Sequence, residues 1–90
     1  MLSPIGSKQF KKDYKLSKSR GKSMKKLIDI MDKLCKEEVL EQKHRDHNLT
    51  GNYVGCRECH VEPDWLLIYS KTEVDIYFIR TGTHSDLFGK

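Results

Sequence analysis

Hydrophobic residues in the first third of the chain recur at the spacing of an α-helix. Phe10 and Tyr14 lie four residues apart and follow Ser7, a residue type that favours the start of a helix. Residues 17–21 interrupt the pattern and end in Gly21, which suits a helix end with positive φ. From Ser23 onward, one apolar stripe repeats at intervals of three and four residues; its members are Met24, Leu27, Ile28, Met31, Leu34 and Cys35. The short link predicts an antiparallel helical hairpin, and the stripe is more typical of a packed core than of a cofactor site.

The hydrophobic pattern changes to that of β-strands from about residue 53. Residues 53–62, 65–70 and 74–81 are rich in β-branched and aromatic side chains, and links of only two and three residues separate them. Links this short favour antiparallel hairpins. Residues 2–5 could add a short edge strand, a position where Pro4 is tolerated. The predicted fold is α+β: an N-terminal helical hairpin packed on one face of a three- to four-stranded antiparallel sheet, whose other face is open.

Length and composition narrow the class of protein. The chain has 90 residues, so we expect one domain spanning 1–90 and exclude a Rossmann or barrel enzyme. No apolar run approaches the ~18 residues of a membrane span, and the N-terminus lacks the apolar core of a signal peptide. We therefore expect no membrane partner. Three cysteines, an odd number, fit free thiols in a reducing compartment, which predicts a cytoplasmic protein.

Charge is distributed unevenly along the chain. Residues 1–36 carry eleven positive and three negative side chains, a local charge of +8, whereas residues 37–90 carry six positive and ten negative, a local −4. A basic half suggests a surface for a polyanion such as RNA, because neutralised phosphates release counterions. The candidate RNA-binding residues are Lys11, Lys12, Lys15, Lys18, Lys22, Lys25, Lys26 and Arg57. Two alternatives stay open: the lysines only solvate two small helices, or they bind an acidic protein.

The segment from Cys56 to His60 matches C-x-x-C-H, the pattern of c-type haem attachment. With His44 and His47 upstream, the two cysteines also suggest a zinc site. Both interpretations require Cys56 and Cys59 on the same side of the chain. In a strand, residues three apart point to opposite faces, so the two thiols cannot converge on one ion. We therefore expect neither a metal nor another cofactor.

A second group of polar residues is predicted at one end of the sheet. Consecutive antiparallel strands bring His60, Asp64, Arg80 and His84 to the same end, with His47 in the link before the sheet. Imidazoles exchange protons near neutral pH, a carboxylate orients them, and an arginine binds a phosphate. Together they could cleave RNA without a metal: a base deprotonates the ribose 2′-OH, and an acid protonates the leaving oxygen. The alternative is that each histidine is a surface side chain without a role.

Four sequence segments in a fixed order carry a resemblance to a known family. They are FKKD at 10–13, DHNLTG at 46–51, RECHVEPDW at 57–65 and RTGTHSDLF at 80–88. The ordered set resembles the YafQ branch of the RelE-type toxins, which are small bacterial mRNA interferases of type II toxin–antitoxin pairs. The resemblance covers nearly the whole chain. It implies a RelE-like fold, metal-independent endoribonuclease activity on messenger RNA in the ribosomal A site, and partners that include the 70S ribosome and a co-encoded antitoxin.

The resemblance also implies roles for individual residues. The family's catalytic positions fall on His47, His60, Asp64, Arg80, His84 and Phe88. By resemblance, His84 is the proton donor and Arg80 binds the phosphate. His60 is the favoured base, and His47 either shares that task or holds the phosphate. Phe88 offers a ring on which a nucleobase could stack.

Trp65 and His44 are not expected to take part in catalysis, and a second function is also considered. Trp65 also matches a family position, and we assign it to packing. His44 has no counterpart in the family, so we expect it at the surface. The alternative function is a non-catalytic module that binds RNA or an acidic protein through its lysines.

Overall fold

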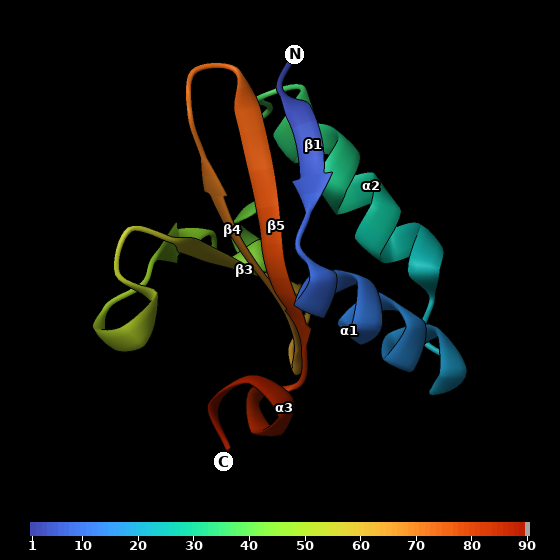
Figure 1. Cartoon of the computed structure of the whole chain (residues 1–90). Helices are drawn as coiled ribbons and strands as arrows, with labels where there is room; N and C mark the ends of the chain where they lie inside the picture. The colour runs from blue at the N-terminus through green and yellow to red at the C-terminus, as the bar shows by residue number, and fades with distance from the viewer. Residues whose placement is uncertain (90) are drawn as a thin grey trace.

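The computed structural model describes residues 1–89, which form two main helices packed against one face of a five-stranded sheet (Figure 1). The strands lie in the order β1-β5-β4-β3-β2. The elements are β1 (Ser3–Gly6), α1 (Lys8–Ser19), α2 (Met24–Cys35), the 3-10 turn η1 (Gln42–His44), β2 (His47–Asn48), the 3-10 turn η2 (Gly51–Tyr53), β3 (Arg57–Glu62), β4 (Trp65–Lys71), β5 (Asp75–Gly82) and α3 (His84–Phe88).

The two predicted helices are confirmed, with adjusted details. Ser7 caps α1, because its hydroxyl accepts a hydrogen bond from the backbone N–H of Phe10 at 2.9 Å. Gly21 has φ +78 just beyond the helix end, as expected. The predicted apolar stripe of α2 is wrong at one position, because Ile28 is 48% exposed and Ile30 is buried in its place. The helix therefore presents a slightly rotated face to the core.

The three central strands pair as antiparallel hairpins, as predicted, but the sheet as a whole is mixed. β1 pairs with β5 in parallel, with Ser3 opposite Asp75, and the two-residue β2 adds a fifth strand. Tight links predict only the pairing of consecutive strands, and the partner of β1 lies about seventy residues away. β3 begins at Arg57 rather than 53, because η2 and Gly55, with φ +89, form a turn before it.

Side chains pack on both faces of the sheet. The larger core lies between the sheet and α1 and α2, and it includes Leu27, Cys59, Trp65 and Phe78. A smaller cluster of Leu66, Ile68 and Leu87 lies on the opposite face. That face was predicted to be open, but α3 and residues 49–56 cover part of it. Within residues 1–89, no helix is both long and apolar enough to cross a membrane.

Candidate active site

Three side chains of the edge strand β2 and its neighbour β3 meet on the sheet face opposite α1 and α2. His47 pairs in register with Glu58, and His60 lies two residues further along β3, so strand alternation sends all three to one face. Nε2 of His47 lies 3.1 Å from Oε2 of Glu58, and Nε2 of His60 lies 3.8 Å from the same oxygen. The ring centroids of His47 and His60 are 6.4 Å apart. One carboxylate therefore lies between two imidazoles.

Glu58 is a member of this group that was not predicted from the sequence. It is only 6% exposed, and its Oε1 has no hydrogen-bond partner within residues 1–89. A buried oxygen without a partner costs about 1–3 kcal/mol, which makes Glu58 a candidate site residue. The signal was present in the sequence, because Glu58 and His60 are two positions apart and a strand places such residues on the same face.

His47 has an acceptor at each ring nitrogen. Its Nδ1 faces the carbonyl oxygen of Arg45, and its Nε2 faces the Glu58 carboxylate. An imidazole donates from both nitrogens only in its doubly protonated form. The His47 ring is therefore held from both sides, by Arg45 and by Glu58.

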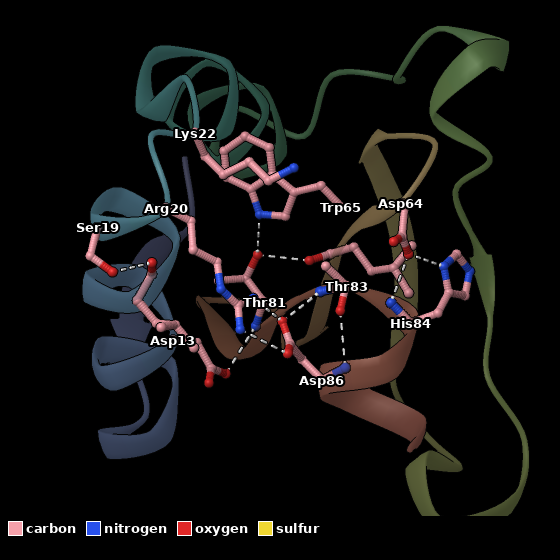
Figure 2. Close-up of polar contacts among 12 residues, drawn as sticks. Asp13, Ser19, Arg20, Lys22, Asp64, Trp65, Thr81, Thr83, His84 and Asp86 are labelled. Atoms are coloured by element: carbon pink, nitrogen blue, oxygen red, sulfur yellow. Dashed lines mark hydrogen bonds and ion pairs between the residues drawn. The ribbon is translucent and has the colours of Figure 1, made fainter. Parts of the chain in front are cut away.

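The third histidine is placed by the start of α3. Thr83 caps this helix, and its hydroxyl and the Asp86 carboxylate form a reciprocal capping box. Asp64, in the turn between β3 and β4, accepts hydrogen bonds from the backbone N–H of His84 at 2.9 Å and from its Nδ1 at 2.6 Å (Figure 2). These bonds, the backbone bond first, lower the pKa of Asp64. With Nδ1 committed to Asp64, Nε2 is the ring nitrogen of His84 that this contact leaves available for proton exchange.

Direct contacts link three of the four residues that were predicted to gather at one sheet end. The rings of His60 and His84 lie 5.8 Å apart, and Asp64 joins them through His84. Arg80 lies further along β5, opposite Ile68, and its Nε donates to Asp13 of α1 at 2.7 Å. That hydrogen bond is the main reason that the pKa of Arg80 is raised. The contact between Arg80 and Asp13 was not predicted, because strand register alone does not reveal a partner on α1.

The aromatic residues divide as expected between surface and core. Phe88, at the end of α3, is 40% exposed and packs edge-to-face on Tyr53 at 6.0 Å between centroids. Trp65 is buried, and its indole N–H donates to Thr81 at 3.0 Å, so its assignment to packing is confirmed. His44 was expected at the surface, but it is half-buried, and its Nδ1 donates to the carbonyl oxygen of His60 at 2.6 Å.

The candidate RNA-binding side chains differ in how they are held. Lys11, Lys12, Lys15 and Lys18 are exposed on α1. Others pair with carboxylates: Lys25 with Asp29, and both Lys22 and Lys26 with Glu62. Lys22 also lies 5.7 Å above the ring of Trp65. Arg57 directs its guanidinium to Asp46 and Asn48. The lysines of α1 therefore form the most accessible basic surface.

The two cysteines of the C-x-x-C-H motif lie on opposite faces of the sheet, with Cys59 inside β3 and Cys56 just before it. Cys59 is fully buried in the core beneath the helices, and burial raises the pKa of its thiol. Cys56 packs against the smaller cluster on the other face. Within residues 1–89, no group of three or more histidine, cysteine, aspartate or glutamate side chains is arranged to hold a metal ion.

Comparisons with known proteins show the family and agree with the fold. The family described as "Bacterial toxin of type II toxin-antitoxin system, YafQ" matches residues 3–89. The mRNA interferase toxin YafQ of Escherichia coli K12 is 46% identical over 84 residues, which cover 92% of this chain and 91% of the relative. The toxin in the crystal structure of the E. coli DinJ-YafQ complex superposes with a TM-score of 0.92, at 43% identity, over 99% of this chain and all of that one.

A structure described as a metal-bound toxin from Helicobacter pylori superposes with a TM-score of 0.91, at 39% identity, over 98% of this chain and all of that one. The relatives match this chain over nearly their whole length, and the fold is shared throughout. The chain therefore belongs to the YafQ family of toxins from type II toxin–antitoxin systems.

Proposed function

We propose that this toxin is an mRNA interferase, an endoribonuclease that cuts messenger RNA in the ribosomal A site by metal-independent acid–base chemistry. The main support is the row of three imidazoles, His47, His60 and His84, with centroid separations of 6.4 and 5.8 Å between neighbours. A carboxylate supports each end of the row, Glu58 at one and Asp64 at the other. A cleavage reaction needs both a proton acceptor and a proton donor near one phosphate, and this row supplies both.

In the proposed reaction, His60 accepts the proton of the ribose 2′-OH, with Glu58 and His47 beside it. The 2′-oxygen attacks the adjacent phosphorus, and the bond to the 5′-oxygen breaks. His84 gives its Nε2 proton to that leaving oxygen, while Asp64 stabilises the imidazolium that carries the proton beforehand. The products are a 2′,3′-cyclic phosphate and a 5′-hydroxyl end, so protons and charge balance.

Arg80 and Phe88 are proposed to bind the substrate. Asp13 fixes the Arg80 guanidinium at the edge of the same sheet face, where it could pair with a phosphate oxygen. Phe88 is 40% exposed, and the free face of its ring could stack on a nucleobase. The exposed lysines of α1 are proposed to contact ribosomal RNA, which would bring the site to the message.

The test is cleavage of a ribosome programmed with a defined message, with the same RNA free of ribosomes as the comparison. Wild-type toxin should cut the bound message, and His84→Ala should lower the rate by ~10²–10⁴-fold, the usual contribution of a general acid. Ser85→Ala, a change in the next residue of α3, is the matched control and should keep the wild-type rate. Full cleavage by His84→Ala would exclude His84 as the acid.

The metal-free part of the proposal is tested separately, since one structural relative is described as metal-bound. Toxin that has been treated with EDTA and then freed of the chelator should cleave the ribosome-bound message as fast as untreated toxin. A loss that zinc or copper restores would show that the chemistry depends on a metal.

The exposed lysines of α1 also support a second candidate function, that of a non-catalytic binding module. In that case reversal of Lys11 and Lys12 to glutamate would abolish toxicity, and His84→Ala would stay toxic.

We also propose a protein partner, a co-encoded antitoxin, because the superposed E. coli toxin is in complex with DinJ. Such a toxin would act in the cytoplasm, where ribosomes are. Co-purification of a short protein encoded beside the toxin would support this partner, and its absence from tagged toxin would argue against it.

A further inference from the structure

His47 lies on a segment with little backbone support. β2 has only two residues, and its ladder consists of His47 opposite Glu58 and Asn48 opposite Arg57. The preceding 3-10 turn ends at Arg45, whose φ of 45 is uncommon for a residue with a side chain. A two-residue strand at a sheet edge frays easily, so something else must hold the His47 ring beside Glu58.

Side chains on the helix side of the sheet supply that restraint. The hydroxyl of Tyr69 donates to Oδ1 of Asp46 at 2.6 Å, and Nε of Arg57 donates to the same oxygen at 3.1 Å. Nη1 of Arg57 donates to Oδ1 of Asn48 at 2.8 Å. One guanidinium thus holds both sequence neighbours of His47, and strand alternation turns His47 itself to the opposite face.

The anchor of this group is rigid. Tyr69 is 1% exposed in the central strand β4, and it lies opposite Arg57 in the register of β3 and β4. Burial, and then the bond to Asp46, raise the pKa of the Tyr69 hydroxyl, so it remains a donor at physiological pH. The Asp46 side chain is only 27% exposed although the segment around it lies at the surface. The segment around β2, at the edge of the sheet, is therefore bonded to the central strand β4.

We infer that Asp46, Arg57 and Tyr69 form a clamp that positions His47 for catalysis, so that Arg57 supports the site instead of binding RNA as the sequence suggested. The inference rests on the proposed role of His47 in messenger RNA cleavage. Release of the clamp would leave the fold intact and allow the His47 ring to move away from Glu58. A displacement of 1 Å in a reacting group can cost about a hundredfold in rate, so partial release should be measurable.

The test compares Tyr69→Phe with Tyr77→Phe, a matched loss of one hydroxyl on the neighbouring strand, where the ring is 37% exposed. The first change should lower kcat for ribosome-bound message by about tenfold with KM unchanged, and the second should change neither. Asp46→Ala should behave like Tyr69→Phe. In a His47→Ala background, Tyr69→Phe should change the remaining rate by less than about twofold, because the clamp acts through His47.

Two readouts separate failure of the clamp from failure of the proposed function. NMR spectra of the histidine rings should show broadened or shifted His47 signals in Tyr69→Phe, with His84 unchanged, whatever the toxin cleaves. Unchanged His47 signals, or an equal rate loss in the His47→Ala background, would overturn the clamp. Altered His47 signals together with full cleavage by His47→Ala would keep the clamp and exclude a role for His47 in cleavage.

Discussion

Asp13 should be worth more to the stability of this toxin than any acidic residue on the outside of its helices. The residue is 6% exposed on α1. It accepts hydrogen bonds from Nε of Arg80 at 2.7 Å, Nη2 of Arg80 at 3.3 Å, the Thr81 backbone N–H at 3.2 Å and the Gln9 amide at 3.1 Å. Substitution of Asp13 by asparagine keeps the shape, removes the charge and turns an amide N–H₂ toward the guanidinium.

The expected cost follows from these contacts. Breaking a fully buried ion pair costs about 3–5 kcal/mol, and one hydrogen bond to a charged group contributes about 1.5–3 kcal/mol. The Arg80 side chain is 23% exposed, so water can replace part of the hydrogen bonding that Arg80 loses when the Asp13 carboxylate is removed. We expect Asp13→Asn to lower the free energy of unfolding by about 2–3 kcal/mol, which is about 10–20 °C in Tm for a domain of this size. Cleavage should fall as well, because Arg80 is no longer oriented.

The assay is urea and thermal denaturation, with Asp29→Asn as the control. Asp29 pairs with Lys25 at 2.9 Å, but the two side chains are 55% and 83% exposed. Exposed pairs on a helix contribute about 0.3–0.5 kcal/mol, so Asp29→Asn should barely change the free energy of unfolding. If Asp13→Asn is as stable as Asp29→Asn, the reasoning from burial is refuted.

Three further outcomes are expected. The pKa of Asp86 is lowered to about 2, first by the hydrogen bond from Arg20. The ionised carboxylate therefore stabilises the fold above its ordinary pKa of 3.8, and this contribution is lost as the pH falls from about 4 to about 2. In Arg20→Met, the free energy of unfolding measured by denaturation should change less across that pH range than in the wild type (Figure 2). Gly82→Ala should destabilise by about 1–3 kcal/mol and lower cleavage, because its Cβ would lie 2.9 Å from Oδ2 and 3.0 Å from Cβ of Asp86; denaturation equal to wild type would contradict this. Iodoacetamide at pH 8 should modify Cys56 well before Cys59, whose buried thiol has a raised pKa. Mass spectrometry of the peptides measures the order, and modification of Cys59 first would contradict the prediction.

The sequence predicted those parts of the fold that depend on near neighbours along the chain. The cap at Ser7, the helix end before Gly21 and the two antiparallel hairpins each follow from a few adjacent residues. The parallel pairing of β1 with β5 does not, because no local pattern links residue 3 to residue 75. The prediction failed where a strand pairs with a partner from the opposite end of the chain.

The candidate site shows the same division. Strand alternation alone brings Glu58 and His60 to one face, and the hairpin between β3 and β4 brings Asp64 to their end of the sheet. The partner of Arg80 is Asp13, which lies 67 residues away, and no rule of spacing connects them. The motif FKKD at 10–13 contained that aspartate, but its sequence gives no sign that it points to the sheet edge rather than to solvent.

Activity in this toxin should depend on residues that do not contact RNA, because the proposed catalytic side chains and the side chains that position them lie on opposite faces of the sheet. His47, Glu58 and His60 lie on one face, and Tyr69 and Arg57 act from the other through a strand of two residues. α1 contributes in the same way: Asp13 orients Arg80 and Arg20 holds the start of α3. Substitutions that abolish toxicity should therefore fall on both faces. Those on the proposed RNA-facing side should lower the rate at unchanged stability, whereas loss of a support on α1 should lower both.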